Sequence, residues 1–157
     1  MRSAHPDYSA ADVYFQTITF ATYRSTALAQ AERKAAGGGA PVYMYRLDWK
    51  TPVMGGRLGA AHAIDLPFVF DNVANSTSYT GPGTNATERL AGLMSDAWIA
   101  FSRTGNPNTP ALPEWTPYSA RDRGTMVFDV TPEFVQDPDS VERVLLQRLL
   151  PAGRPVR

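Results

Sequence analysis

The sequence predicts an α/β fold in which helices pack against the strands of a mainly parallel sheet. A helical pattern over residues 14–36 is followed directly by a strand pattern over residues 41–49, and this succession is the unit from which parallel sheets are built. The apolar residues of that strand are nearly continuous from Val42 to Tyr45, which suits a strand covered on both faces. A length of 157 residues corresponds to roughly one domain.

The composition excludes several classes of function. Fifteen basic and fifteen acidic residues leave no net charge, so we expect no nucleic-acid partner. The absence of Cys excludes a thiolate nucleophile, a disulfide and a Cys-ligated zinc. The longest strongly apolar windows hold about ten residues where a membrane span needs about twenty, so we expect no membrane partner. Asp7 and Asp12 interrupt the place of an apolar signal-peptide core, so we expect no secretory signal.

The N-terminal elements follow from apolar spacing and from glycine. Residues 1–12 are polar and indicate a loose lead-in, after which the main domain is expected to span 13–150. Residues 14–36 are predicted to be helical because apolar residues recur on one face, namely Ile18, Ala21, Leu28, Ala31 and Ala35. Residues 37–39 are three glycines that can end this helix. They follow a helix and lack the Lys of a phosphate-binding loop.

The middle of the chain is predicted from turn and capping residues. Residues 51–63 form a Gly-rich loop, and Asp65 followed by Pro67 predicts an N-cap and a short helix. Residues 71–83 consist mainly of turn-forming residues and predict a surface loop.

A long helix and two shorter elements are predicted in the remainder. The residues from Asn85 to Glu88 resemble a capping box, and the helix that they open runs to about Arg103. Its apolar face contains Ala86, Leu90, Leu93, Met94, Ala97 and Phe101. A strand over 125–130, a helix over 141–150 and a disordered tail at 151–157 complete the prediction.

One of the two histidines is a candidate for chemistry. His5 lies in the polar lead-in and is best interpreted as solvated. His62 lies in the loop after the strand, where ligands and catalytic groups of α/β sheets gather, and an imidazole can both take and give a proton near neutral pH. From these residues alone, a structural role for His62 is as well supported as a catalytic one. A metal site of His62 with Asp65 would lack a third ligand.

Five separated segments resemble, in the same order, segments of the type B carboxylesterases, a family that includes the cholinesterases. The segment Gly59-Ala-Ala-His-Ala-Ile-Asp-Leu-Pro-Phe-Val-Phe70 resembles the one around that family's catalytic His. The other segments are 11–15, 42–45, 98–108 and, late in the chain, 115–118 with 126–128. The resemblance covers about residues 11–130. It implies the C-terminal portion of an α/β-hydrolase fold, with helices packed on the last few strands of an incomplete sheet.

The resemblance also implies a reaction. His62 would be the general base and acid of a Ser-His-Glu/Asp triad acting on a small-molecule carboxylic ester, with no cofactor or metal. Asp65 is not expected to be the triad acid, because N-capping explains it more simply. Triad order in this fold places the Ser and the acid before the His. No Ser in this chain has Gly at both the second residue before it and the second residue after it, and no His-Gly-Gly segment occurs.

The missing groups define the expected partner. The nucleophile, the oxyanion hole and the acid would lie in a missing N-terminal part of the same domain, so the chain alone is expected to be inactive and its strand at 41–49 to expose an unpaired edge. A second hypothesis is a non-catalytic adhesion or binding relative with the same fold. Four aromatic residues are expected to be core: Phe68, Phe70, Trp98 and Trp115.

Overall fold

The described residues form a sheet of three strands. The structure, a computed structural model, describes residues 6–149. Strands β1 (Met44–Leu47), β2 (Gly124–Phe128) and β3 (Glu133–Gln136) lie in the order β1-β2-β3. β1 and β2 are parallel, whereas β2 and β3 are antiparallel. β1 is therefore an edge strand, and no other strand within the described residues pairs with its second edge.

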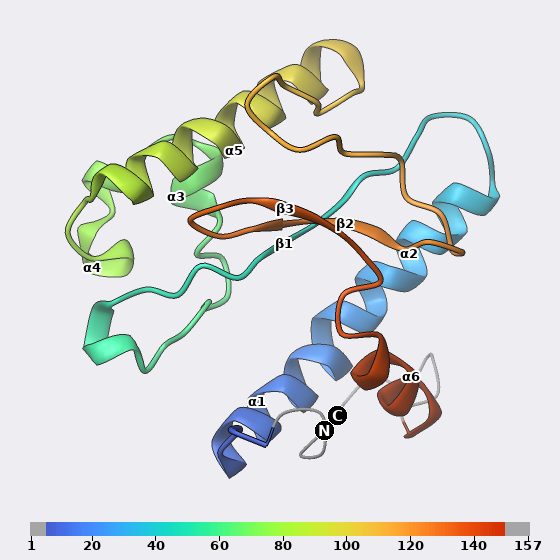
Figure 1. Cartoon of the computed structure of the whole chain (residues 1–157), viewed down its shortest axis with the longest axis horizontal. Coiled ribbons are helices and arrows are strands. Elements are labelled where there is room, and N and C mark those ends of the chain that lie inside the picture. The colour runs from blue at the N-terminus through green and yellow to red at the C-terminus, as the bar shows by residue number, and fades with distance from the viewer. Residues whose placement is uncertain (1–5, 150–157) are drawn as a thin grey trace.

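Helices cover both faces of this sheet, as Figure 1 shows. One group consists of α1 (Ala10–Thr19), the π-helix η1 (Phe20–Arg24), α2 (Ser25–Ala36) and α6 (Ser140–Leu149). The other consists of α3 (Leu66–Val69), α4 (Thr77–Thr80) and α5 (Asn85–Thr104), with the short 3-10 helices η2 (Val53–Gly56) and η3 (Val73–Asn75) in the connecting loops. This arrangement agrees with the predicted α/β class.

Two hydrophobic clusters lie on opposite faces of the sheet. The larger contains Phe68, Met94 and Phe128, which are fully buried. The smaller contains Phe20, Leu28, Ala31, Tyr118 and Leu146. Side chains of β1 and the residues before it alternate between the two: Tyr43, Tyr45 and Leu47 pack on the larger cluster, and Val42 and Met44 on the smaller. The near-continuous apolar run is thus explained by coverage of both faces.

Helix α1 begins inside the stretch predicted as a lead-in. It starts at Ala10 because Ser9 and Asp12 form a capping box, in which the Ser9 Oγ accepts the Asp12 N–H at 3.2 Å. At its far end the helical segment stops at Ala36, as predicted, and the left-handed residues are Gly38 and Gly39. The tail predicted as disordered lies outside the described residues.

The start of α5 was predicted correctly, but its cap was not. The N-cap is Thr84, whose hydroxyl accepts the Thr87 N–H at 3.2 Å, while Thr87 Oγ1 accepts the Thr84 N–H at 2.8 Å. The Asn85–Glu88 capping box is therefore wrong by one residue. Thr84 and Thr87 form the cap in place of Asn85 and Glu88, because each Thr hydroxyl can both donate and accept a hydrogen bond at the required spacing.

Other segments also differ from prediction. Residues 71–83 contain η3 and α4 with Val73 and Thr80 buried, so they are only partly a surface loop. Phe70 is 74% exposed and is not a core residue, whereas Phe68, Trp98 and Trp115 do belong to the larger cluster or pack against it. β3 was not predicted, since only two adjacent apolar residues mark it.

Candidate active site

His62 lies in the loop that leaves the carboxyl end of β1 and enters α3. Ile64 and Phe68, on its C-terminal side, are buried in the larger cluster and anchor the chain there. The His62 side chain itself is exposed. The buried residues thus anchor the loop, while the imidazole stays accessible at the surface. A group that transfers protons requires such access.

Hydrogen bonds fix this loop at both ends. The buried Thr51 donates its N–H to the Gly59 carbonyl at 3.1 Å and its hydroxyl to the Tyr79 carbonyl at 2.7 Å. The Tyr79 hydroxyl in turn donates to the backbone carbonyl of His62. Tyr79 of α4 therefore ties the beginning of the loop to His62. Sequence pattern did not predict this role, because Tyr79 lies in the stretch predicted as a surface loop.

The residue after His62 has a strained backbone. Ala63 has a φ of 63°, in the left-handed region. This conformation costs an L-residue other than Gly roughly 1–2 kcal/mol. Such strain persists only where the surroundings impose it, and it clusters at functional sites. Here the anchored loop on one side and buried Ile64 on the other impose it.

The imidazole of His62 stacks on the ring of Tyr23. Their centroids are 5.0 Å apart and the planes are inclined by 19°. Tyr23 belongs to the π-helix η1, and π-helical turns inside α-helices are frequent at functional sites. Within residues 6–149, no carboxylate or hydroxyl is hydrogen-bonded to the His62 ring. The stack is therefore the feature that orients it here.

Asp65 occupies the N-cap position of α3, as predicted, but it does not cap the helix by a hydrogen bond. Its backbone is already helical, and no backbone N–H of the first turn donates to its side chain. Its carboxylate instead accepts the Tyr45 hydroxyl at 2.8 Å, because a hydroxyl packed against the core needs a partner. Burial raises the pKa of Tyr45, and the hydrogen bond and charge of Asp65 raise it further.

A cavity of about 650 Å³ opens beside His62. It lies between the helical segment that carries Tyr23, the strand β1 and the loop at residues 60–65. His62, Asp65 and Tyr45 all contribute to its wall. In the described part of the chain, no three His, Asp or Glu side chains gather to hold a metal ion.

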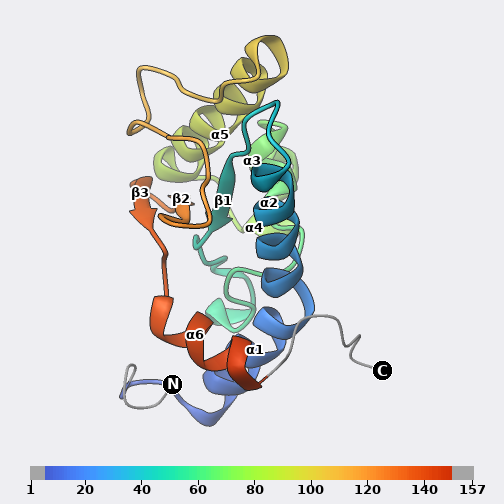
Figure 2. The same ribbon diagram turned by 90° about the vertical axis from the view of Figure 1, so that its right-hand side faces the viewer.

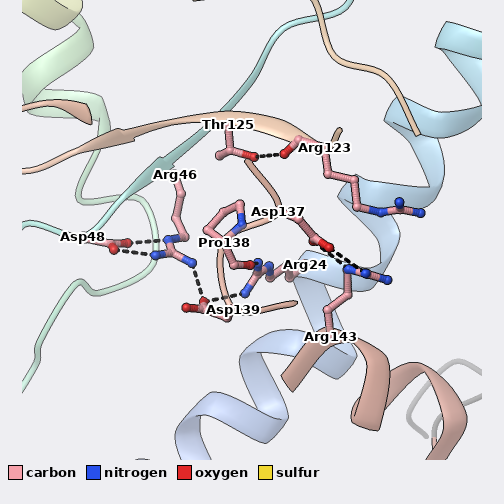
Figure 3. A network of polar contacts seen from close by, with 9 residues as sticks. All are labelled: Arg24, Arg46, Asp48, Arg123, Thr125, Asp137, Pro138, Asp139 and Arg143. Carbon is pink, nitrogen blue, oxygen red and sulfur yellow. Dashed lines mark hydrogen bonds and ion pairs between the residues drawn. The ribbon is translucent and has the colours of Figure 1, made fainter. Parts of the chain in front are cut away.

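Figure 3 shows the ion-pair network that holds η1 against β1. The Asp139 carboxylate accepts hydrogen bonds from Arg24 of η1, at 2.7 Å, and from Arg46 of β1. Arg46 also donates two hydrogen bonds of 2.6 Å to the Asp48 carboxylate. Arg24 further donates to the carbonyl of Pro138. Burial raises the pKa of Asp139, but the charges of Arg46 and Arg24 outweigh it and hold that pKa below its usual value. Nothing in the sequence pattern predicted this network.

Comparison with known proteins gives consistent matches. The profile of the carboxylesterase family matches residues 5–145. The chain is 34% identical over 150 residues to the para-nitrobenzyl esterase of Bacillus subtilis (strain 168). This match covers 90% of this chain and 29% of that protein. It is 36% identical over 108 residues to the phenmedipham hydrolase of Pseudarthrobacter oxydans, covering 64% of this chain and 22% of that protein.

The structural match is of similar extent. A carboxylesterase of Geobacillus stearothermophilus, in a crystal structure at pH 6.2, superposes with a TM-score of 0.78 at 34% identity. The match covers 92% of this chain and 30% of that one. The chain thus spans less than a third of the length of these relatives. No helix in residues 6–149 combines the length and the apolar character needed to cross a bilayer.

Proposed function

Because this chain belongs to the carboxylesterase family and shares the fold of α/β-hydrolase esterases, we propose that it is the C-terminal portion of a carboxylic ester hydrolase and supplies its catalytic His62. One observation carries the proposal: an exposed imidazole on an anchored loop, at the carboxyl end of a parallel strand, facing a cavity. Active groups of α/β folds gather at that end of the strands.

The chemistry assigned to His62 is proton transfer in two half-reactions. The imidazole takes the proton of a serine hydroxyl as that oxygen attacks the ester carbonyl, and gives it to the departing alkoxide. It then takes a proton from water, whose oxygen attacks the acyl group, and returns it to the serine. Tyr79 holds the His62 backbone and Tyr23 holds the ring, so both support a fixed direction of transfer.

The remaining catalytic groups come from the N-terminal part of the same domain. The chain spans only 29% of the para-nitrobenzyl esterase that it resembles, and none of its Ser residues lies in a Gly-x-Ser-x-Gly segment. The small-molecule ester substrate therefore binds only to the completed domain. The chain alone lacks the nucleophile and the oxyanion donors, whose contribution to the rate is large.

The test uses the completed domain, obtained as the full-length protein or as two co-expressed pieces. His62→Ala should lower the turnover of a p-nitrophenyl ester by about six orders of magnitude. His5→Ala is the matched control and should leave turnover unchanged. Wild-type turnover in the His62 variant would end the proposal. A stable completed domain without any turnover would favour the non-catalytic binding alternative.

A second measurement uses the isolated chain. It should not react with a serine-directed fluorophosphonate, because within the described residues no serine hydroxyl is hydrogen-bonded to an imidazole; the hydroxyls of Ser9 and Ser119 donate to the carboxylates of Asp12 and Asp122. Stoichiometric labelling of any serine would show that the chain carries a nucleophile of its own.

A further inference from the structure

The π-helix η1 lies between the C-terminal helix α6 and the loop that carries His62. One face of η1 presents Tyr23, which lines the cavity beside His62 and stacks on its imidazole. Another face presents Arg24 and Phe20, and Phe20 is buried in the smaller cluster together with Leu146 of α6. In Figure 2, α6 lies beside the helical segment that runs from α1 to α2. The ring that orients His62 is therefore part of an element that α6 contacts from another side.

One carboxylate joins η1 to the strand from which the His62 loop departs. The Asp139 carboxylate lies between Arg24 of η1 and Arg46 of β1, as Figure 3 shows, and accepts hydrogen bonds from both. The side chains of the two arginines are 20% and 29% exposed, so water and salt screen these ion pairs only in part. The carboxylate therefore helps to fix where η1 lies against β1, and with it where the ring of Tyr23 lies over the imidazole.

The turn that carries Asp139 is itself held in place. Asp137 and Asp139 both have left-handed backbones, with φ of 45° and 54°. Such conformations persist only where the surroundings impose them. Arg143 of α6 donates hydrogen bonds of 2.7 and 2.6 Å to the Asp137 carboxylate, and its backbone N–H donates to the Asp139 carbonyl at 2.9 Å. The Asp139 carboxylate thus meets η1 from a constrained turn.

The ring of Tyr23 depends on the position of η1. Tyr23 is 52% exposed, so its direction follows from the helix that carries it and from the stack on His62 rather than from close packing on all sides. A displacement of about 1 Å in a group that positions the reacting atoms can cost about a hundredfold in rate. A shift of η1 would disturb the stack without changing any group that transfers a proton.

We propose that Asp139 is a positioning residue for the proton transfer by His62, and that it acts through Arg24 and η1 on the ring of Tyr23. This inference rests on the proposed function. Asp139 does not touch the imidazole, so its effect on the reaction passes entirely through the stack. The turn before α6 thereby takes part in setting the rate, a role that lies outside the sequence segment around His62.

The test measures turnover of a p-nitrophenyl ester by the completed domain. Asp139→Asn removes the charge that both arginines share, and should lower kcat by about tenfold with KM nearly unchanged. Glu32→Gln is the matched control, because the Glu32–Arg123 ion pair has the same length of 2.7 Å and nearly the same exposure as Arg24–Asp139. Glu32→Gln should leave kcat unchanged, since that pair lies away from η1.

A double-mutant cycle separates positioning from general destabilisation. In a Tyr23→Leu background, Asp139→Asn should lower kcat no further, because the ring through which it acts is gone. NMR of the completed domain with carbon-13-labelled histidine gives a second readout, with His62→Gln assigning the signal. The upfield shift of the His62 ring protons should shrink in Asp139→Asn and stay unchanged in Glu32→Gln. Should Asp139→Asn not fold, Arg24→Lys, which keeps the charge but loses the fork of donors, tests the same dependence on Tyr23.

Each outcome decides the inference. Wild-type kcat in Asp139→Asn overturns it, and so does an equal loss of kcat in Glu32→Gln. A further tenfold loss in the Tyr23→Leu background also overturns it, because Asp139 would then act independently of the stack. A wild-type domain without turnover, in which Asp139→Asn still shrinks the His62 shift, overturns the proposed function alone. Wild-type turnover with an unchanged shift in Asp139→Asn overturns the positioning role alone.

Discussion

Tyr23 and His62 stack with their ring centroids 5.0 Å apart and their planes only 19° from parallel. No hydrogen bond is recorded between the side chains of Tyr23 and His62, so the packing of the two rings is the contact that relates them. The arrangement depends on η1 lying against β1, which the Arg24–Asp139–Arg46 ion pairs enforce.

The first prediction concerns this stack. Tyr23→Leu should remove the upfield shift that the phenol ring imposes on the carbon-bound ring protons of His62, whereas Tyr23→Phe should preserve it, because the ring and not the hydroxyl makes the contact. NMR of the isolated chain measures it, with His62→Gln assigning the signal. In the completed domain, Tyr23→Leu should lower kcat by up to about a hundredfold with KM nearly unchanged. A Tyr23→Leu spectrum identical to wild type would contradict the stack.

Ala63 provides the second prediction. Its φ of 63° favours glycine, so Ala63→Gly should raise the free energy of unfolding by about 1 kcal/mol. Ala61, in the same loop, has no such left-handed backbone, so Ala61→Gly should lower the free energy of unfolding. Chemical denaturation of the two variants measures both. Destabilisation by Ala63→Gly would mean that the backbone strain is absent.

The third prediction concerns Asp139. Its pKa is held below the ordinary value of 3.8, so its stabilisation is complete above that value and is lost as pH falls through the lowered pKa. Asp139→Asn should therefore cost about 1–3 kcal/mol at neutral pH, since two Arg side chains lose a charged acceptor. The cost should shrink progressively below pH 3.8.

The control for Asp139 is Asp122. Its carboxylate lies 3.8 Å from the 92% exposed Arg121, and ion pairs of this exposure contribute little. Asp122→Asn should leave the free energy of unfolding nearly unchanged across the same pH range. An equal pH dependence in both variants would show that Asp139 is not specially stabilised.

The fourth prediction concerns Tyr45 and Asp65. Tyr45→Phe keeps the edge-on packing against Trp98 but leaves the Asp65 carboxylate without its donor. A double-mutant cycle with Asp65→Ala should give a coupling free energy of about 1 kcal/mol. Urea denaturation of the four proteins measures it. A coupling of zero would show that the 2.8 Å hydrogen bond contributes nothing to stability.

Local pattern predicted much of this protein because its causes are local. The long helix from Asn85, the end of α2 at Ala36 and the short helix from Leu66 follow from apolar periodicity, glycine and proline within a few residues. These elements depend on neighbours within about one helical turn, which a sequence displays directly. The segment around His62 was identified differently, because it and four other segments resemble, in the same order, segments of the carboxylesterase family.

The tertiary structure decided what depends on distant residues. The Asp65 carboxylate, expected to cap α3, instead accepts a hydrogen bond from Tyr45, which lies twenty residues away in the sequence. The Tyr45 hydroxyl is packed against the core and requires an acceptor. Tyr23 and Tyr79 meet His62 only because η1 and α4 fold toward its loop. The Arg24–Asp139 pair joins residues 115 positions apart. Such contacts follow from the three-dimensional packing of the elements, and no spacing along the chain reveals them.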